Sequence, residues 1–372
     1  MKIVLLGNSR SIHVERHAIG LHNMGHEIYL LSMQPKNLTN IKVYDITNQN
    51  SVPNIRLIRP IMEILHSIVY LRKIRKIVKN IQPDIVYAHY LTDYGILGSQ
   101  LNVHPYVIKL EGSDLLLAPK KFGTKHISSM KNAFSKADRI LIPALQMKDR
   151  VKEFGVDESL IEYIPNAVDI QQFYPQIGPN IVKLKNKLGL MGYSVGISTR
   201  ALEPVYNIDC LLQAIPIVTK NVPRAKFIIL GSGSLQTYLK NKVRALDISE
   251  YVYFAGHVSH VDVAKYMNIA DIYVSTSISD SLSVAALEAA ACGLVLALSD
   301  IPANRELLNN DVRCSLFENN PQSLAQTLIY CLMNLHKMKK EALERNIEVV
   351  KQKYGWTNYL TRLENLFLSL CT

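Results

Sequence analysis

The chain has 372 residues, of which 48% are hydrophobic and 20% are charged, so it is long enough for two folded domains and too apolar for a disordered protein. Its five cysteines form no C-x-x-C pair, which disfavours a disulfide framework or a zinc site and favours a reducing, cytoplasmic setting. The formal net charge is +11, and residues 1–165 carry +8 of it, with 22 Lys and Arg against 14 Asp and Glu.

Short β-branched runs alternate with amphipathic stretches along the chain, which predicts an α/β fold with parallel sheets. A helix is expected after the first strand, because Val14, Ala18 and Leu21 share one helical face and Gly25 follows. In the first half the expected strands are Lys2–Leu6, Glu27–Leu31, Ile55–Ile58, Asp84–Ala88, Pro105–Leu110, Arg139–Ile142 and Ile161–Ile164.

The second half repeats this rhythm, with helices expected at Asp209–Val218 and Val261–Asn268. The expected strands are Val195–Ser198, Lys226–Leu230, Tyr251–Ala255, Ile272–Ser275, Leu294–Ala297 and Arg313–Phe317. We therefore predict two Rossmann-like domains, at 1–168 and 185–350, joined by a linker at 169–184 that has two prolines and little periodicity. A last helix, about 356–370 within a C-terminal segment 351–372, could pack on either domain. Ligands of such sheets bind at the carboxyl ends of the strands, so a cleft lined by these loops is expected.

The basic first half should be drawn to anionic surfaces, and a membrane face or phosphorylated substrate fits better than nucleic acid, for which no binding motif is present. Residues 61–81 combine an apolar stripe with a basic side made of Arg72, Lys73, Arg75, Lys76 and Lys79. Such a helix can lie in a membrane interface or pack on a sheet with its charges in water, and the two are not exclusive. No stretch is apolar and long enough for a transmembrane helix.

The stretch 279–293 is the most informative part of the sequence. It predicts a loop after the strand at 272–275, then a helix from about Leu282, whose free backbone N–H groups suit a phosphate or a sugar hydroxyl. Glu288 is the one charge in this small, apolar helix. A buried carboxylate needs hydrogen-bond donors, which a ribose diol or a structural Lys or Arg could supply.

Arg200 follows a predicted strand and could clamp a diphosphate with two parallel hydrogen bonds, although most arginines are simply solvated. Glycines at 231 and 233 and at Gly7 also follow strands, where a tight turn or a phosphate contact would explain them. The sequence has no D-x-D, H-E-x-x-H, P-loop or G-x-S-x-G motif, which disfavours metal-bridged sugar transfer, zinc hydrolysis, P-loop chemistry and serine hydrolysis.

Together these residues resemble the family 4 (group 1) glycosyltransferases of GT-B fold, over the whole length of the chain. Residues 164–169 resemble I-P-N-G-V-D, 198–200 the G-R-L position, 231–233 G-D-G, 254–258 F-x-G-x-V, and 266–277 Y-x-x-A-D-x-x-V-x-P-S. Asp280 and Glu288 match the E-x7-E pair, with Asp in place of the first Glu. Further likeness lies in Gly7 to His13, His89-Tyr90, Gly112 to Asp114, and 300–306.

The resemblance implies a retaining transferase that needs no metal or other cofactor, uses a nucleotide-sugar donor, and acts on a glycan, lipid-linked or small-molecule acceptor in cell-surface polysaccharide or glycolipid synthesis, in the cytoplasm or at the inner face of the membrane. It implies catalytic roles for Arg200, Asp280 and Glu111, with Asp280 near the donor sugar and Glu288 on the ribose. The implied donor-binding residues are Gly7, Arg200, Gly231, His257, Val258, Asp280, Ser281, Leu282, Ser283 and Glu288, and the implied acceptor-side residues are His13, His89, Ser113 and Asp114.

Three positions depart from the family pattern. The usual lysine partner of the arginine is Tyr206, the usual histidine before Gly-Ser-Asp is Glu111, and the first acid is Asp280, one methylene shorter. The missing lysine and histidine leave open a non-catalytic GT-B subunit that binds a partner enzyme. A nucleotide-sugar epimerase on the same fold also stays open, because the fold alone does not decide the reaction.

Overall fold

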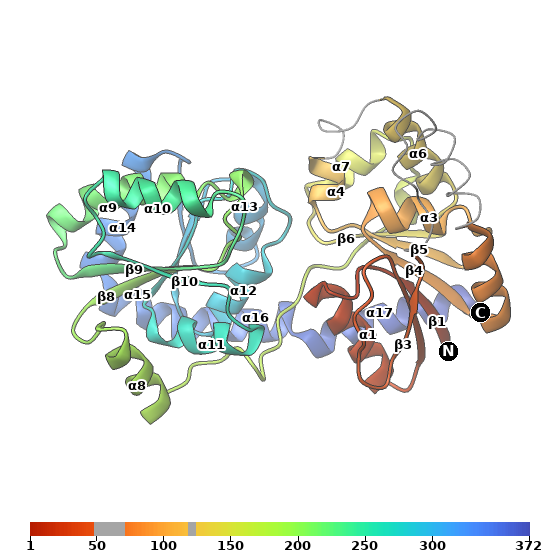
Figure 1. Cartoon of the computed structure of the whole chain (residues 1–372), viewed down its shortest axis with the longest axis horizontal. Helices are drawn as coiled ribbons and strands as arrows, with labels where there is room; N and C mark the ends of the chain where they lie inside the picture. The colour runs from red at the N-terminus through yellow and green to blue at the C-terminus, as the bar shows by residue number, and fades with distance from the viewer. Residues whose placement is uncertain (48–70, 118–123) are drawn as a thin grey trace, which may run out of the picture. The chain divides into compact units, whose positions relative to one another are not determined.

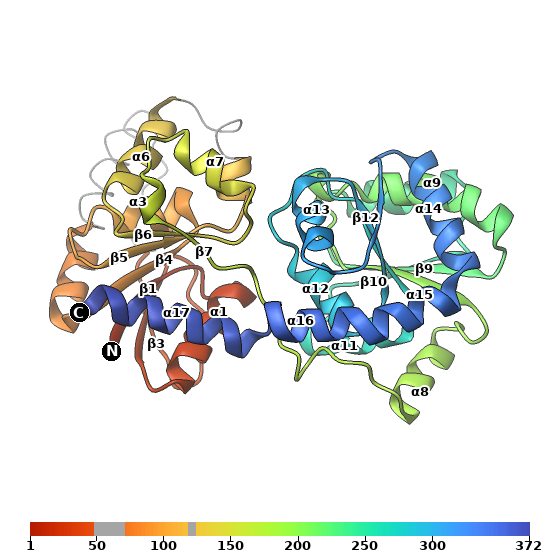
Figure 2. The same cartoon turned by 180° about the vertical axis from the view of Figure 1, so that it is seen from behind.

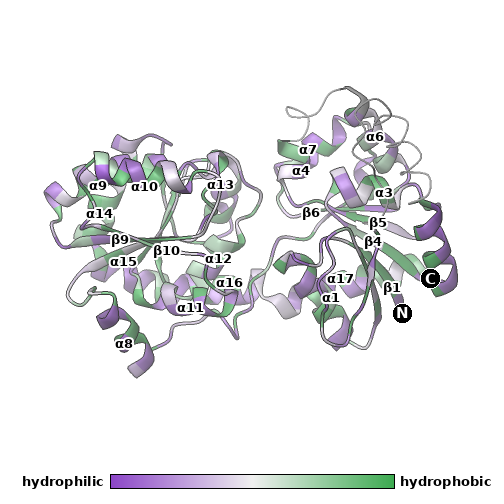
Figure 3. Ribbon diagram, viewed as in Figure 1, coloured by the Kyte–Doolittle hydropathy of each residue, from purple (hydrophilic) through white to green (hydrophobic). Residues whose placement is uncertain are grey.

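The computed structural model describes residues 1–47, 71–117 and 124–372, and the chain forms two compact units (Figure 1). The first unit contains Met1–Ile164 together with the C-terminal residues Leu360–Thr372, and the second contains Pro165–Tyr359. Both are layered α/β units, each built on one parallel sheet. In Figure 3 the helices carry both hydrophilic and hydrophobic residues, as expected for elements with one face on a sheet and the other in solvent.

The first sheet has the strand order β3-β2-β1-β4-β5-β6-β7. Its strands are β1 Lys2–Leu6, β2 Glu27–Ser32, β3 Lys42–Asp45, β4 Ile85–His89, β5 Tyr106–Lys109, β6 Arg139–Ile142 and β7 Ile161–Tyr163. Its helices are α1 Ile12–Asn23, a helix at 71–81, the π-helical turn η1 Leu91–Gly95, α3 Ile96–Gly98, α4 Ser113–Leu116, α6 Thr124–Ser135, α7 Met147–Lys152 and the short η2 Glu158–Leu160.

The second sheet has the strand order β10-β9-β8-β11-β12-β13. Its strands are β8 Ser194–Ser198, β9 Ala225–Leu230, β10 Val252–Gly256, β11 Ile272–Ser275, β12 Val295–Ser299 and β13 Ser315–Phe317. Its helices are α8 Pro179–Lys187, η3 Pro204–Tyr206, α9 Ile208–Asn221, α10 Gln236–Ala245, α11 His260–Ile269, α12 Val284–Ala291, α13 Pro302–Asn309, α14 Pro321–Met333, α15 Leu335–Glu341, η4 Ala342–Asn346 and α16 Ile347–Tyr354, followed by α17 Trp356–Cys371, which ends in the first unit. Fully buried Leu212, Ile215 and Val218 of α9 belong to the same core as Ile229 of β9 and Leu328 of α14.

Sequence and structure agree on the parallel α/β architecture and on most strands, within one or two residues at their ends. The strand expected at 55–58 lies outside the described residues. Strand β3 was not expected from the sequence, because its four residues include a charge at either end and no buried side chain. Within the range 169–184, expected as a linker, residues 179–184 already belong to α8.

The helix at 71–81 packs its apolar side, since Ile74, Val78 and Ile81 are buried. Its basic residues Arg72, Lys73, Arg75, Lys76 and Lys79 are all exposed. For this part of the 61–81 stretch, packing of the apolar stripe is therefore observed, and the charged side remains available to a partner. Among the described residues, no helix has the length and apolarity needed to cross a bilayer.

Each sheet reverses its strand order at one point, between β1 and β4 in the first unit and between β8 and β11 in the second. In open α/β sheets the loops at such a switch point diverge and leave room for a ligand at the carboxyl ends of the strands. Gly7 and His89 lie at this point in the first unit, and Arg200 and Asp280 lie at it in the second.

The C-terminal part of α17 belongs to the first unit, alongside its sheet (Figure 2). Phe367 is fully buried and its ring lies edge-on to that of Tyr87 in β4, with centroids 5.1 Å apart. Glu364 accepts a hydrogen bond from His26 Nε2 at 2.8 Å, and Arg362 donates to the carbonyl of Tyr163. The first unit is thus completed by the last residues of the chain.

Replacing Phe367 with Ala should lower the free energy of unfolding of the first unit by about 3–5 kcal/mol, because it removes a buried ring and leaves a cavity beside Tyr87. The neighbouring control is Leu368→Ala, whose side chain is 45% exposed and whose loss should cost about 0.5 kcal/mol or less. Chemical denaturation of the full chain measures both. Equal, small effects of the two changes would contradict the packing of α17 on this unit.

Candidate functional site

The second unit brings Arg200 and Asp280 together at its switch point. Arg200 follows β8 and Asp280 follows β11, the neighbouring strand, so 80 residues of sequence separation become direct contact. Arg200 Nη2 donates to Asp280 Oδ2 at 2.7 Å, and Nη1 donates to the hydroxyl of Ser283 at 3.0 Å. The sequence predicted each of these residues in the site, and the structure shows that they bind one another.

The guanidinium of Arg200 is largely withdrawn from water, with its side chain 10% exposed and that of Asp280 16% exposed. Burial by itself would lower the pKa of Arg200, but the nearby Asp280 carboxylate outweighs it and raises that pKa. The ring of Tyr206 lies 4.2 Å from the guanidinium carbon, a cation–π distance. Tyr206, which the family resemblance aligns with the usual lysine, therefore stacks on the arginine.

The glycine-containing loop after β9 packs against the backbone of Arg200 and Leu202. Gly231 has φ +131°, and a Cβ placed there would lie 2.6 Å from the backbone oxygen of Arg200. A Cβ on Gly233 would similarly lie 2.5 Å from the backbone oxygen of Leu202, whose N–H donates to the carbonyl of Ser232. These glycines allow two loops to pack backbone against backbone, which explains them without a phosphate contact.

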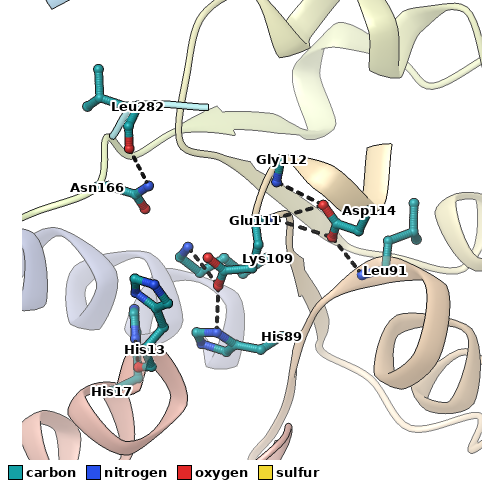
Figure 4. A network of polar contacts seen from close by, with 10 residues as sticks. All are labelled: His13, His17, His89, Leu91, Lys109, Glu111, Gly112, Asp114, Asn166 and Leu282. Carbon is teal, nitrogen blue, oxygen red and sulfur yellow. Dashed lines mark hydrogen bonds and ion pairs between the residues drawn. The ribbon is translucent and has the colours of Figure 1, made fainter. Parts of the chain in front are cut away.

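Helix α12 begins beside this pair. Ser283 caps it, accepting a hydrogen bond from the backbone N–H of Ala286, and Ser281 and Leu282 just before it are buried. Asn166 Nδ2 donates to the carbonyl of Leu282 at 2.8 Å and fixes the loop (Figure 4). The result is a rigid helix N-terminus next to one arginine, a combination that binds anions well.

Glu288 lies in the second turn of α12 and is 5% exposed. Its Oε1 accepts a hydrogen bond from His260 Nε2, the first residue of α11, at 2.8 Å. A histidine, and not a lysine or arginine, is thus its partner. His257 and Val258 lie in the loop between β10 and α11, and Ser259 separates them from this histidine.

The first unit gathers a second polar cluster at its switch point (Figure 4). Glu111, after β5, accepts hydrogen bonds from His89 Nδ1 at 2.9 Å and from Lys109 Nζ at 3.0 Å. His89 and Lys109 are 1% and 2% exposed, whereas Glu111 is 17% exposed. The ring of His17 in α1 lies edge-on to His89 with centroids 4.4 Å apart.

Burial fixes the protonation states in this cluster. It lowers the pKa of His89 to about 4, although Glu111 opposes the shift, so His89 is neutral at pH 7 with its proton on Nδ1. Burial alone would raise the pKa of Glu111, but Lys109 and the hydrogen bond from His89 outweigh it and hold that pKa well below its usual range. Glu111 is therefore an ionised, partly accessible hydrogen-bond acceptor.

Two other residues predicted for the first unit, Ser113 and Asp114, lie at the start of α4. Asp114 is fully buried and accepts hydrogen bonds from the backbone N–H groups of Leu91, Glu111 and Gly112, so it shapes the loop that carries Glu111. Burial raises the pKa of Asp114 to about 6. The hydroxyl of Ser113 lies 3.1 Å from that of Tyr90.

His13 and Gly7 lie at the start of the first unit. The carbonyl of His13 accepts a hydrogen bond from His17 Nδ1 at 2.7 Å. Gly7 lets α1 approach closely, since a Cβ there would lie 2.9 Å from both methyl groups of Val14.

Several members of these clusters were not expected as site residues. Lys109 interrupts an otherwise apolar strand, and His17 lies one helical turn after the predicted His13; these are the two sequence signals that could have revealed Lys109 and His17. His260 lies 28 residues before Glu288, so no local pattern marks their contact. Within residues 1–47, 71–117 and 124–372, no three His, Cys, Asp or Glu side chains converge as a metal site would require.

Comparison with known proteins identifies the family and the fold of the chain. The model of the glycosyl transferases group 1 matches residues 182–348, and that of the glycosyl transferase 4-like proteins matches residues 2–143. Alpha-monoglucosyldiacylglycerol synthase of Acholeplasma laidlawii is 22% identical over 374 residues, which cover 94% of this chain and 91% of that protein. The UDP-Gal:alpha-D-GlcNAc-diphosphoundecaprenol alpha-1,3-galactosyltransferase of Escherichia coli is 28% identical over 255 residues, 66% of this chain and 65% of that protein.

Among solved structures, Anabaena HepE in complex with UDP-glucose superposes with a TM-score of 0.84 at 19% identity, over 100% of both chains. Two units, each built on one parallel sheet, and the likeness to HepE place the chain in the GT-B fold class. The chain belongs to the group 1 glycosyltransferases, and it is a glycosyltransferase enzyme.

Replacing Gly231 with Ala should distort the site more than the same change at Gly256. Both glycines have positive φ, so both changes introduce backbone strain of about 1–3 kcal/mol, but only the Cβ at 231 also meets the Arg200 backbone. We expect a larger loss of thermal stability for Gly231→Ala, measured by calorimetry. If the two variants unfold at the same temperature, the packing of this loop on Arg200 is wrong.

Proposed function

We propose that this glycosyltransferase moves a sugar from a UDP-sugar to a glycan or lipid-linked acceptor, with retention of the anomeric configuration and without a metal ion. The observation that carries the proposal is the buried Arg200, held by Asp280 and Ser283 at the N-terminus of α12. The UDP-glucose in the HepE complex and the lipid acceptors named for the Acholeplasma and Escherichia relatives support the choice of substrates.

In this proposal the donor diphosphate binds the Arg200 guanidinium and takes the place of the Asp280 carboxylate. The guanidinium offers two parallel donors to phosphate oxygens, and the free N–H groups of α12 add a positive dipole end. Both are in place before the bond to the sugar breaks, so they stabilise the charge that develops on the leaving diphosphate. Asp280, released from Arg200, can then bind a hydroxyl of the donor sugar, while Glu288 binds the ribose.

The acceptor side is proposed to lie in the first unit. Its ionised Glu111 is suited to accept a hydrogen bond from a sugar hydroxyl, and Lys109 and His89 keep it charged. His13, His89, Ser113 and Asp114 would shape this side, His89 and Asp114 from buried positions. No protein nucleophile is needed, because the acceptor hydroxyl attacks on the face from which the diphosphate leaves.

Transfer should persist in excess EDTA, because Arg200 and the α12 N-terminus take the place of a cation. Replacing Arg200 with Gln should lower the rate by about 10²–10³-fold, the usual effect of losing one donor to a developing negative charge. The measurement is UDP release from UDP-glucose or UDP-galactose in the presence of vesicles containing diacylglycerol or undecaprenyl-linked sugar. The exposed Arg224→Gln serves as control.

Loss of activity on chelation that magnesium or manganese restores would contradict the metal-free mechanism. UDP release that does not depend on any acceptor would instead favour an epimerase-type or hydrolytic reaction. Binding of UDP-sugar without turnover, restored by a second protein, would favour the non-catalytic subunit.

We further propose that the enzyme binds anionic membranes peripherally through the basic side of the 71–81 helix. Its five basic residues are exposed while Ile74, Val78 and Ile81 are buried, so attraction to anionic headgroups is the available force. Each basic residue near an anionic surface contributes about 1 kcal/mol, which is enough for reversible docking.

Changing all five residues to Gln should strongly reduce co-sedimentation with phosphatidylglycerol-containing liposomes and leave UDP affinity unchanged, because the donor residues belong to the second unit. The same charge change in exposed lysines of the second unit is the matched control and should have little effect. The control positions are Lys240, Lys265, Lys337, Lys340 and Lys351. Binding should also weaken with salt, since the Debye length falls to about 3–4 Å above about 0.5 M. Equal sedimentation of both variants would show that the 71–81 helix is not the docking element.

A further inference from the structure

In the second unit, a series of hydrogen-bonded side chains connects Glu288 to the segment that precedes α8. Its Oε1 accepts from His260 Nε2 at 2.8 Å. On the other side of the imidazole, Gln172 Nε2 lies 3.2 Å from His260 Nδ1 and donates to the backbone carbonyl of His260 at 2.8 Å. Three residues from three separate parts of the unit thus form one line of hydrogen bonds.

The chemistry of these atoms fixes the tautomer of His260. An amide nitrogen can only donate, so Nδ1 of the imidazole must accept the hydrogen bond from Gln172. The ring proton is therefore on Nε2, where it points at Glu288. The ring is also held in place from the side, since the ring of fully buried Phe173 lies 5.1 Å from it, centroid to centroid.

This arrangement occupies one oxygen of Glu288 and leaves the other for a ligand. Within the described part of the chain, His260 is the hydrogen-bond donor that reaches the Glu288 side chain, and it reaches Oε1. A carboxylate with one oxygen bound by a fixed donor has a defined orientation, as seen when outer partners orient metal ligands. The free oxygen then points in one direction and not several.

We infer that Gln172 and His260 are positioning residues that orient the Glu288 carboxylate for the ribose hydroxyls of the donor. This inference rests on the proposed function, in which Glu288 binds ribose. A purely structural role would require only that the buried carboxylate be paired. A positioning role also requires that His260 and Gln172 determine how well the enzyme distinguishes a ribose from a sugar without hydroxyls.

The experiment measures the affinities of UDP and of 2′,3′-dideoxy-UDP by calorimetry for the full chain and its variants. Wild type should bind UDP about tenfold more tightly or better, the value of one or two charge-assisted hydrogen bonds. In Glu288→Gln this ratio should fall at least several-fold. His260→Leu and Gln172→Leu should lower it in the same way, while their affinity for dideoxy-UDP stays near that of wild type.

Two variants serve as matched controls. In His260→Gln the amide nitrogen can take the place of imidazole Nε2 and donate to Glu288, so the ratio should be largely restored. His336→Leu removes an exposed histidine of α15 and should change nothing. Recovery by glutamine but not by leucine is a result that a packing role alone does not produce.

The outcomes distinguish failure of the proposed donor site from failure of the positioning role. If wild type fails to bind UDP, the proposed donor site fails and the inference fails with it. If wild type binds both nucleotides equally, the assignment of Glu288 to ribose fails, while a diphosphate site at Arg200 does not depend on that result. If wild type discriminates and folded His260→Leu and Gln172→Leu discriminate equally well, the positioning role is overturned. Should His260→Leu fail to fold, Gln172→Leu and His260→Gln decide the matter by the same ratio.

Discussion

The largely buried Arg200, in the loop that follows β8, is the constraint on which the proposed donor site depends. The Arg200 guanidinium is 10% exposed, and a charge so far from water must be paired and hydrogen-bonded. Asp280 and Ser283 supply this, and they belong to the loop that leads into α12. Pairing the cation therefore fixes that loop and the helix N-terminus, and the glycines at 231 and 233 allow the adjoining loop to pack closely against its backbone.

Each of the three residues that depart from the family pattern contacts a neighbouring group of suitable charge. The ring of Tyr206 stacks on the Arg200 guanidinium at a position where a second cation would repel it, and the Asp280 carboxylate forms an ion pair with that guanidinium. In the first unit, Glu111 is matched by the buried Lys109 of the preceding strand and by His89. Each of the three residues is therefore paired with a neighbouring group that suits its chemistry.

The sequence predicted the parts of this molecule that depend on local patterns. Apolar runs indicated most of the strands, and the loop-helix-glycine pattern of 279–293 indicated α12, whose observed start at Val284 is two residues later. The sequence did not predict strand β3, because this strand is short and only half-buried. Family resemblance placed Arg200, Asp280 and Glu288 in the site, but neither the Arg200–Asp280 pair nor the His260–Glu288 pair follows from it. Those contacts depend on which strands become neighbours and how their loops meet.

The most direct test of the account is a crystal structure of the enzyme with UDP bound. We predict diphosphate oxygens within about 3 Å of the Arg200 guanidinium and of the first N–H groups of α12, with a ribose hydroxyl on the free oxygen of Glu288. Asp280 should have given up its hydrogen bond to Arg200. A nucleotide bound elsewhere, or a diphosphate that leaves the Arg200–Asp280 pair intact and untouched, would contradict the central claim.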